Sequence, residues 1–494
     1  MNKYPAAGKK TKSIKTNAIL NSVRTVLNLL FPLITFTYVS RILSVGELGK
    51  YNFSSSIISY FLLLAALGID KYAVREGAKY RDDRKKISQF SSEIFTINIS
   101  STLISYGCLF LYLIFSQKAQ NYATCIIIFS IQIIFTTVGT EWLYVIYEEY
   151  KYITVRSIIF KIISIMLLFT FVKRPGDYLN YTAVTVFATV GSNVLNFIHA
   201  RKLCNIHLKI HFEWMKRLVP ILIIFASNVA IQIYVTSDIT MLGYLKNDYT
   251  VGIYGVSTKI YNAILPVLAA ALTVTIPRFS LYAGMKMKKE YDSLMLKVAN
   301  SLFVIIFPSV IGLIMLSKNI VLIIGGSKYE ASQTSLIILS IAIFFSIFST
   351  LFNQCVLIPY RREKYSLFSS VFSACENIGL NFFMIPLLAE RGAAITTVLA
   401  EFTMASMNFY NIRDIIGDIF INKITIRNIL TILVGCTSII VICVMSSAFI
   451  SNIIIQTLVA IAGSFFVYTG SLFLLKNPIV NMMLDQIKNR LKKD

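Results

Sequence analysis

Long apolar stretches recur along the whole chain and are separated by short polar connectors. The first stretch runs about 25 residues behind a lysine-rich N-terminal segment, which is too long for the apolar core of a signal peptide. About 20 consecutive apolar residues are enough for a helix to cross a bilayer. The pattern therefore predicts fourteen transmembrane helices, with a retained first helix, at 17-42, 48-69, 91-116, 122-147, 153-173, 179-200, 218-242, 250-276, 295-316, 333-358, 366-388, 392-412, 426-447 and 452-475.

Basic residues alternate between the connectors. The N-terminal segment 1-16, every second connector and the C-terminal tail 476-494 hold 35 of the 47 Lys and Arg residues, and the other seven connectors hold 9. Cytoplasmic loops of membrane proteins carry the excess of Lys and Arg. The alternation therefore predicts an even number of helices, with both termini in the cytoplasm.

A weak internal repeat relates the two halves of the chain. Leu48-Gly49-Lys50-Tyr51 lies at the junction of the first two predicted helices, and Val251-Gly252-Ile253-Tyr254 lies at the junction of the seventh and eighth. An even number of helices per repeat gives a two-fold relation along the membrane normal. We expect an N-lobe over 17-203 and a C-lobe over 218-413 around a central cavity, joined by a cytoplasmic loop over 204-217, with two peripheral helices within 426-475. The alternative is that Gly-x-Tyr is merely a common turn.

The composition excludes several classes of protein. Hydrophobic residues make up 56% of the 494 residues and charged residues 14%, so no large soluble catalytic domain fits beside fourteen helices. The net charge of +23 comes from short basic runs between apolar blocks, which indicate topology rather than nucleic-acid binding. The seven cysteines are scattered, and no nucleotide-binding or hydrolase motif is present. We expect no metal, no cofactor, no catalytic residues and no enzyme activity.

Three basic residues lie well inside the predicted helices, once those near helix ends are counted with the adjoining connectors. They are Arg24, Lys161 and Lys259, and a charge within the bilayer normally faces a wet interior with a partner or a ligand. We expect all three to line the central cavity and to bind an anionic head group, because arginine offers a fork of donors to phosphate oxygens. The alternative for Lys161 is that its side chain extends to the membrane interface.

Four acidic residues also occupy predicted helices. They are Glu141, Asp238, Glu376 and Glu401. Each either pairs structurally with a base or, as we consider for Glu376 and Glu401, holds the proton or cation that drives transport.

Two prolines lie beyond the charged positions of the first and eighth predicted helices. Pro32 follows Arg24 by eight residues, and Pro266 follows Lys259 by seven. Proline frees a backbone carbonyl and permits a kink. Both are candidate gating kinks, although such kinks are also static packing features.

Several short motifs give the chain a family resemblance. They are Arg41-Ile42-Leu43-Ser44-Val45-Gly46-Glu47-Leu48-Gly49-Lys50-Tyr51, Gly68-Ile69, Ala73-Val74-Arg75-Glu76, Val251-Gly252-Ile253-Tyr254, Gly326-Ser327-Lys328-Tyr329-Glu330-Ala331 and Arg391-Gly392-Ala393-Ala394. In this order, within fourteen helices, they resemble the Wzx-type flippases of O-antigen and capsule repeat units. These belong to the polysaccharide-transporter branch of the multidrug/oligosaccharidyl-lipid/polysaccharide flippase superfamily.

The resemblance implies an all-α polytopic protein of the bacterial inner membrane. It would move an undecaprenyl-diphosphate-linked oligosaccharide to the outer leaflet by alternating access, driven by H⁺, Na⁺ or the membrane potential. Its partners would be this substrate, membrane lipid and the polysaccharide polymerase with its chain-length regulator. The first and eighth helices, which carry Arg24 and Lys259 here, line the cavity in the related lipid II flippases.

Three other functions stay open on the sequence. A multidrug exporter of the same superfamily favours acidic cavity residues, and a lipid II flippase differs mainly in its substrate. A membrane glycosyltransferase or polymerase needs a large external loop with catalytic residues, and no connector here exceeds about 25 residues.

Overall fold

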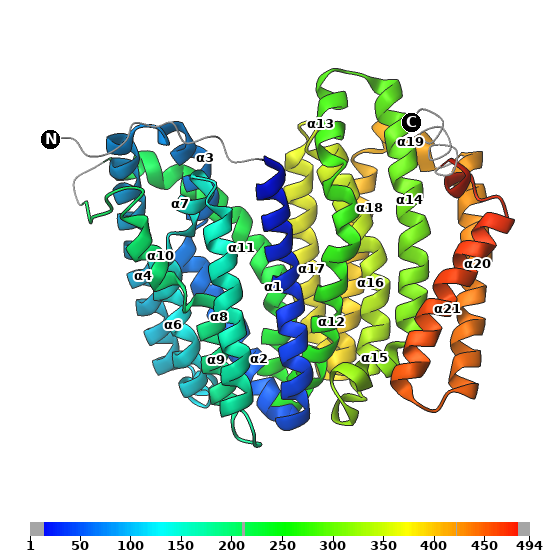
Figure 1. The fold of residues 1–494 in the computed structure, drawn as a ribbon, viewed down its shortest axis with the longest axis horizontal. Coiled ribbons are helices and arrows are strands. Elements are labelled where there is room, and N and C mark those ends of the chain that lie inside the picture. Colours follow the sequence, from blue (N-terminus) through cyan, green and yellow to red (C-terminus); the bar gives the residue numbers. More distant parts are fainter. Residues whose placement is uncertain (1–13, 210–212, 421, 483–494) are drawn as a thin grey trace. The chain divides into compact units, whose positions relative to one another are not determined.

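The computed structural model describes residues 14–209, 213–420 and 422–482, which fold almost entirely into helices (Figure 1). No β-strand occurs in these ranges. Most of the predicted N-terminal segment 1-16 and the end of the predicted tail 476-494 lie outside them. Contacts divide the chain into two compact units, Met1–Gly252 and Ile253–Asp494.

The first unit contains eleven described α-helices and the beginning of a twelfth. They are α1 (Ile14–Ile42), α2 (Val45–Ala66), α3 (Ile69–Gly77), α4 (Arg84–Phe115), α5 (Gln117–Gln120), α6 (Ala123–Gly139), α7 (Glu141–Ile146), α8 (Tyr150–Phe171), α9 (Tyr178–Val190), α10 (Asn193–Ala200), α11 (Trp214–Leu245) and the start of α12 (Asp248–Thr273). Helix α11, which we expected in the C-lobe, packs against α2 in this unit. The division into two six-helix lobes stays a prediction.

The second unit contains the rest of α12 and the helices that follow it. They are α13 (Ile276–Gly284), α14 (Lys288–Met315), α15 (Ser317–Ile324), α16 (Ser332–Phe352), α17 (Glu363–Leu388), α18 (Glu390–Tyr410), α19 (Arg413–Phe420), α20 (Lys423–Phe449) and α21 (Ile453–Leu474). A π-helical turn, Asn353–Leu357, extends α16. The all-α polytopic fold is therefore confirmed.

Thirteen helical segments of the described ranges are long and apolar enough to cross a membrane. The remaining predicted block, 392-412, which is the twelfth, forms α18, which has 21 residues and packs against α16 and α17. Glu390, Arg391 and Glu401 lower its mean hydropathy, so α18 does not qualify as a span on composition. The count of fourteen spans is not confirmed.

Two of the expected helices in the first unit, 122-147 and 179-200, are each divided in two, and a separate short helix, α3, occupies the start of the predicted connector after 48-69. Helices α2 and α3 are separated by Leu67 and Gly68, with φ of 47° and 75°, and α6 and α7 by Thr140, with φ of 40°. Helices α9 and α10 are separated at Gly191-Ser192. At Gly68 a Cβ would lie 2.7 Å from Ile224 Cγ2, so glycine fits both the left-handed backbone and the close approach of α11.

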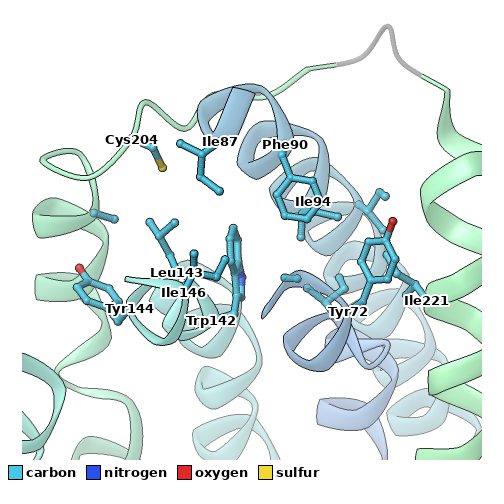
Figure 2. Close-up of a cluster of buried hydrophobic side chains, with 14 of the residues drawn as sticks. Tyr72, Ile87, Phe90, Ile94, Trp142, Leu143, Tyr144, Ile146, Cys204 and Ile221 are labelled. Atoms are coloured by element: carbon cyan, nitrogen blue, oxygen red, sulfur yellow. The ribbon is translucent and has the colours of Figure 1, made fainter. Parts of the chain in front are cut away.

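The short helices α3 and α7 are anchored in a cluster of buried hydrophobic side chains. Figure 2 shows Trp142, Leu143 and Ile146 of α7 near Ile87 and Phe90 of α4. Tyr72 of α3, Ile221 of α11 and Cys204 complete its edges. Because the cluster is shared by so many helices, it fixes the positions at which the divided helices begin.

The repeat seen in the sequence forms a reciprocal helix crossing. A Cβ at Gly49 of α2 would lie 1.8 Å from the Asp248 carbonyl oxygen of α12, and one at Gly252 of α12 would lie 2.2 Å from the Val45 carbonyl oxygen of α2. The offset of 203 residues that relates Gly49 to Gly252 also relates Val45 to Asp248. Reciprocal contacts of this kind are what a two-fold relation between equivalent helices produces.

The same offset of 203 residues relates the N-terminal caps of these helices. Ser44 Oγ accepts from Glu47 N at 3.3 Å, and Asn247 Oδ1 accepts from Thr250 N at 3.0 Å. Both helices therefore begin at a side-chain N-cap and carry a glycine at the crossing, while the internal repeat itself stays a prediction.

The segment after α10 is fastened along α4. The backbone N–H groups of Asn205, His207 and Lys209 donate to the hydroxyls of Ser88, Ser92 and Thr96, at 3.0, 3.2 and 2.9 Å. Alternate residues of an extended segment advance about 6.6 Å and four residues of a helix about 6.0 Å, so the two spacings nearly match. Buried Glu93 accepts from Lys209 and Arg217, each at 3.1 Å. The first part of the predicted inter-lobe loop thus belongs structurally to the first unit.

We expect Gly49→Ala to destabilise the protein by about 1–3 kcal/mol, since its methyl group would meet backbone rather than a movable side chain. Thermal unfolding in detergent measures the effect. Gly107→Ala is the control, because a Cβ at this position of α4 would meet nothing within 4 Å. Equal melting temperatures for the two variants would contradict the tight crossing.

Candidate functional site

Arg24 and Glu141, both predicted site residues, form an ion pair. The Nη2 atom of Arg24 on α1 donates to Oε1 of Glu141, the first residue of α7. The side chains are 23% and 38% exposed. Glu141 reaches this position because Thr140 ends α6 in a left-handed conformation and a new helix begins. The pair therefore joins α1 to a half-helix.

Lys161, the second predicted cation, is held against α1 by neutral partners. Its Nζ donates to Asn28 Oδ1 and lies 5.5 Å from the centre of the Phe31 ring. Asn28 lies one turn after Arg24, so both face the same side of α1. Lys161 therefore lies against α1 near Arg24, whose like charge repels it.

Arg156 is a third cation of this group, which the sequence analysis missed. We counted it with the preceding connector, although it lies inside the predicted helix 153-173; in the structure α8 begins at Tyr150, and Arg156 is 8% exposed. Its guanidinium lies 5.6 Å from the centre of the Tyr152 ring. Its Nε and Nη1 atoms are buried and have no hydrogen-bond partner in the described parts of the chain. Its place inside the predicted helix was the signal that would have identified it.

Asp70 is the fifth ionisable member of the group. It lies in the first turn of α3, as Glu141 does in α7, where the helix dipole stabilises a carboxylate. Asp70 and Glu141 repel each other, and Arg156 interacts with both Glu141 and Arg24. We call Arg24, Asp70, Glu141, Arg156 and Lys161 the charged cluster. Three cations and two anions leave it with one excess positive charge.

The other predicted site residues are not brought into this cluster by the described contacts. Asp238 lies on α11 of the first unit and is 8% exposed, and Lys259 lies on α12 in the second unit. Glu376 on α17 accepts from Thr403 Oγ1 of α18 at 3.1 Å, and Glu401 on α18 is 4% exposed. The two glutamates do lie on neighbouring helices, as expected.

The two predicted kink positions lie within unbroken helices. Pro32 is inside α1 and Pro266 inside α12. Sharp changes of backbone direction in the first unit occur instead at Leu67-Gly68 and Thr140. The gating role of the prolines stays a prediction. Within the described residues, no group of three or more His, Cys, Asp or Glu side chains could hold a metal ion.

An apolar groove of about 580 Å³ lies in the second unit. Helices α12, α14, α15, α20 and α21 line it, with few polar atoms, through side chains that include Ile264, Pro308, Leu316, Ile439 and Phe465. The predicted peripheral helices, α20 and α21, thus form one wall of a concave apolar surface.

The chain is similar to transport proteins along most of its length. It is 23% identical to a protein of Escherichia coli K12 over 81% of this chain and 97% of the relative, and 23% identical to one of Shigella dysenteriae over 71% and 88%. Both relatives carry the name "Putative O-antigen transporter".

Two solved structures share the fold. The lipid II flippase MurJ in an inward closed conformation aligns with a TM-score of 0.73 and 16% identity, over 94% of this chain and all of MurJ. An inward-facing multidrug resistance transporter of the MATE family aligns with a TM-score of 0.61 and 13% identity, over 82% of this chain and 99% of the transporter. At these identities the likeness concerns the fold alone.

A family model described as "Polysaccharide biosynthesis protein" matches residues 14–283, more than half of the chain. The family resemblance inferred from the motifs is thereby confirmed, and so is the expectation of a transporter rather than an enzyme. This multi-pass membrane protein belongs to the polysaccharide biosynthesis protein family, among the Wzx-type polysaccharide flippases.

Proposed function

We propose that this protein moves a polyprenyl-diphosphate-linked oligosaccharide from the cytoplasmic to the outer leaflet of a bacterial inner membrane. Both termini would lie in the cytoplasm, and the substrate would be a repeat unit of O-antigen or capsule. The family and the names of the relatives support a transporter of polysaccharide precursors.

The charged cluster is the observation that carries this proposal. Placing three cations and two anions within membrane-spanning helices is costly, so a protein retains them only where they bind, couple or pair. A diphosphate is the part of the substrate that such a group recognises, since charge-assisted hydrogen bonds to phosphate are among the strongest in proteins. Arg24 and Lys161 would hold it, and Lys259 stays a separate predicted substrate-binding residue of the second unit.

The apolar groove suits the other end of the same substrate. A polyprenyl chain carries no polar atom, and the lining side chains offer almost none. We propose that part of this chain lies in the groove while the head group is transferred. The protein would thus bind the two chemically opposite parts of its substrate at separate places.

Alternating access would carry the head group across, with H⁺ or Na⁺ as the coupling ion. Glu376, half-buried on α17, and Glu401, buried on the adjacent α18, are the candidates for holding that ion. Lipid II and cationic drugs are the alternative cargoes suggested by the two structural neighbours, and the assay below distinguishes them.

In a strain that lacks this gene, we expect lipid-linked oligosaccharide to accumulate in the cytoplasmic leaflet. A leaflet-resolved assay measures the accumulation, and the intact chain should reverse it. Increased sensitivity to drugs without accumulation would instead assign the protein to drug export. Accumulation of lipid II would assign it to that substrate.

Arg24→Ala and Lys259→Ala should each abolish export in this assay while membrane levels of the protein stay near normal. Arg24→Lys should retain partial export, because it keeps the charge but loses the guanidinium fork. If both alanine variants restored export fully, the hypothesis of a cationic binding site would be contradicted. A lysine variant as inactive as the alanine variant would show that hydrogen-bond geometry matters more than charge.

Gly312→Leu should reduce export at least about tenfold by filling the apolar groove. A Cβ at Gly312 meets nothing within 4 Å, so the added side chain enters open space in the groove without a clash. Gly284→Leu is the matched control, since Gly284 is equally open and is not among the residues that line the groove. Normal export by the Gly312 variant would refute the role of the groove.

A further inference from the structure

Glu141 interacts with two arginines but is hydrogen-bonded to only one of them. The Nη2 atom of Arg24 donates to Oε1 of Glu141, while Arg156 interacts with the same carboxylate only at longer range. Arg156 is the more deeply buried of the two, and its Nε and Nη1 donors are without hydrogen-bond partners among the described residues. A buried donor that stays unpaired is destabilising, so this arrangement calls for a functional reason.

Binding of a diphosphate to Arg24 creates a second problem. The phosphate competes with Glu141 for the Arg24 guanidinium, whose Nη2 atom donates to Glu141 and whose Nε atom has no partner among the described residues. If the phosphate displaces Glu141, a half-buried carboxylate loses its charge partner, which weakens binding. Glu141 does not gain a partner by turning towards α3, because the Asp70 carboxylate repels it. Binding at Arg24 would therefore be weak unless another cation receives Glu141.

We propose that Arg156 is that receiver: when an anionic head group takes Arg24, the Glu141 carboxylate turns to the free Nε and Nη1 donors of Arg156. Glu141 is then a counter-ion that changes partner rather than a fixed structural brace. Arg156 acts through Glu141 and is a positioning residue, not a contact of the substrate. The inference rests on the proposed function, since it assumes an anionic head group at Arg24.

The local structure supports such an exchange. The Arg156 guanidinium lies 5.6 Å from the centre of the Tyr152 ring, and Tyr152 stacks on both Tyr144 and His199, with ring centres 5.3 and 4.2 Å away. Glu141 is 38% exposed on its side chain and stands at the first position of α7, so it has room to rotate. A rigid arginine beside a movable carboxylate is the geometry that a change of partner requires.

The test is a double-mutant cycle in the full-length protein. Binding of farnesyl diphosphate, a short polyprenyl diphosphate, is measured by calorimetry in nanodiscs of phosphatidylcholine. The variants are Arg156→Gln, Glu141→Gln and the double variant. Lys151→Gln is the matched control, because it removes one positive charge from an exposed position of the same helix.

Arg156→Gln should weaken binding at least about tenfold, because displaced Glu141 then finds no partner. Glu141→Gln should tighten binding by removing the competitor for Arg24. In the Glu141→Gln background, Arg156→Gln should change the affinity less than about twofold. This coupling distinguishes a change of partner from a loss of fold, which would weaken binding in both backgrounds.

A tenfold loss that persists in the Glu141→Gln background would overturn the inference and make Arg156 a direct phosphate ligand. Unchanged affinity of Arg156→Gln in the otherwise native chain would overturn it as well. Should Arg156→Gln not fold, Arg156→Lys must keep affinity within about threefold of the native protein, since it still offers a charged donor. If the native protein does not bind farnesyl diphosphate, or if Arg24→Ala binds it as tightly as the native protein does, the proposed function fails instead.

Discussion

The ion pair between Arg24 and Glu141 is the constraint on which the site depends. An arginine two turns into a membrane-spanning helix requires a compensating charge, and the carboxylate that supplies it comes from a helix divided at Thr140. The division in turn depends on the buried hydrophobic cluster that anchors α7 and α3 beside α4 (Figure 2). Apolar packing around α7 and α3 thus maintains the ion pair between Arg24 and Glu141.

The helix crossing at Gly49 and Gly252 plays the corresponding role for the repeat. Two helices approach until each backbone touches the other, and only glycine permits that distance. The caps at Ser44 and Asn247 start both helices at equivalent positions. Together with the segment fastened along α4, these contacts make the first unit a body of its own that extends through Gly252.

The chemistry of the proposed substrate accounts for features that otherwise have no common explanation. A polyprenyl-linked sugar diphosphate has one strongly charged part and one wholly apolar part. The charged cluster in the first unit matches the former, and the groove lined by α14, α20 and α21 matches the latter. A counter-ion that changes partner, as we propose for Glu141, would let the charged part bind without leaving an unpaired charge behind.

Hydrophobic length, basic-residue alternation and the spacing of short motifs were enough to predict an all-α transporter of this family, because the bilayer itself dictates span length and charge placement. They also singled out Arg24, Glu141 and Lys161, since charges inside apolar stretches are conspicuous. They missed Arg156, which was counted with the connector before α8, and Asp70, which lies in the predicted connector where α3 begins. Only the tertiary structure decided that Arg24 pairs with Glu141 and that Lys161 donates a hydrogen bond to Asn28. It also decided that Gly49 and Gly252, 203 residues apart in the chain, each lie against the backbone of the other's helix. These outcomes depend on where helices break and pack against segments distant in the chain, and no local pattern of residues carries that information.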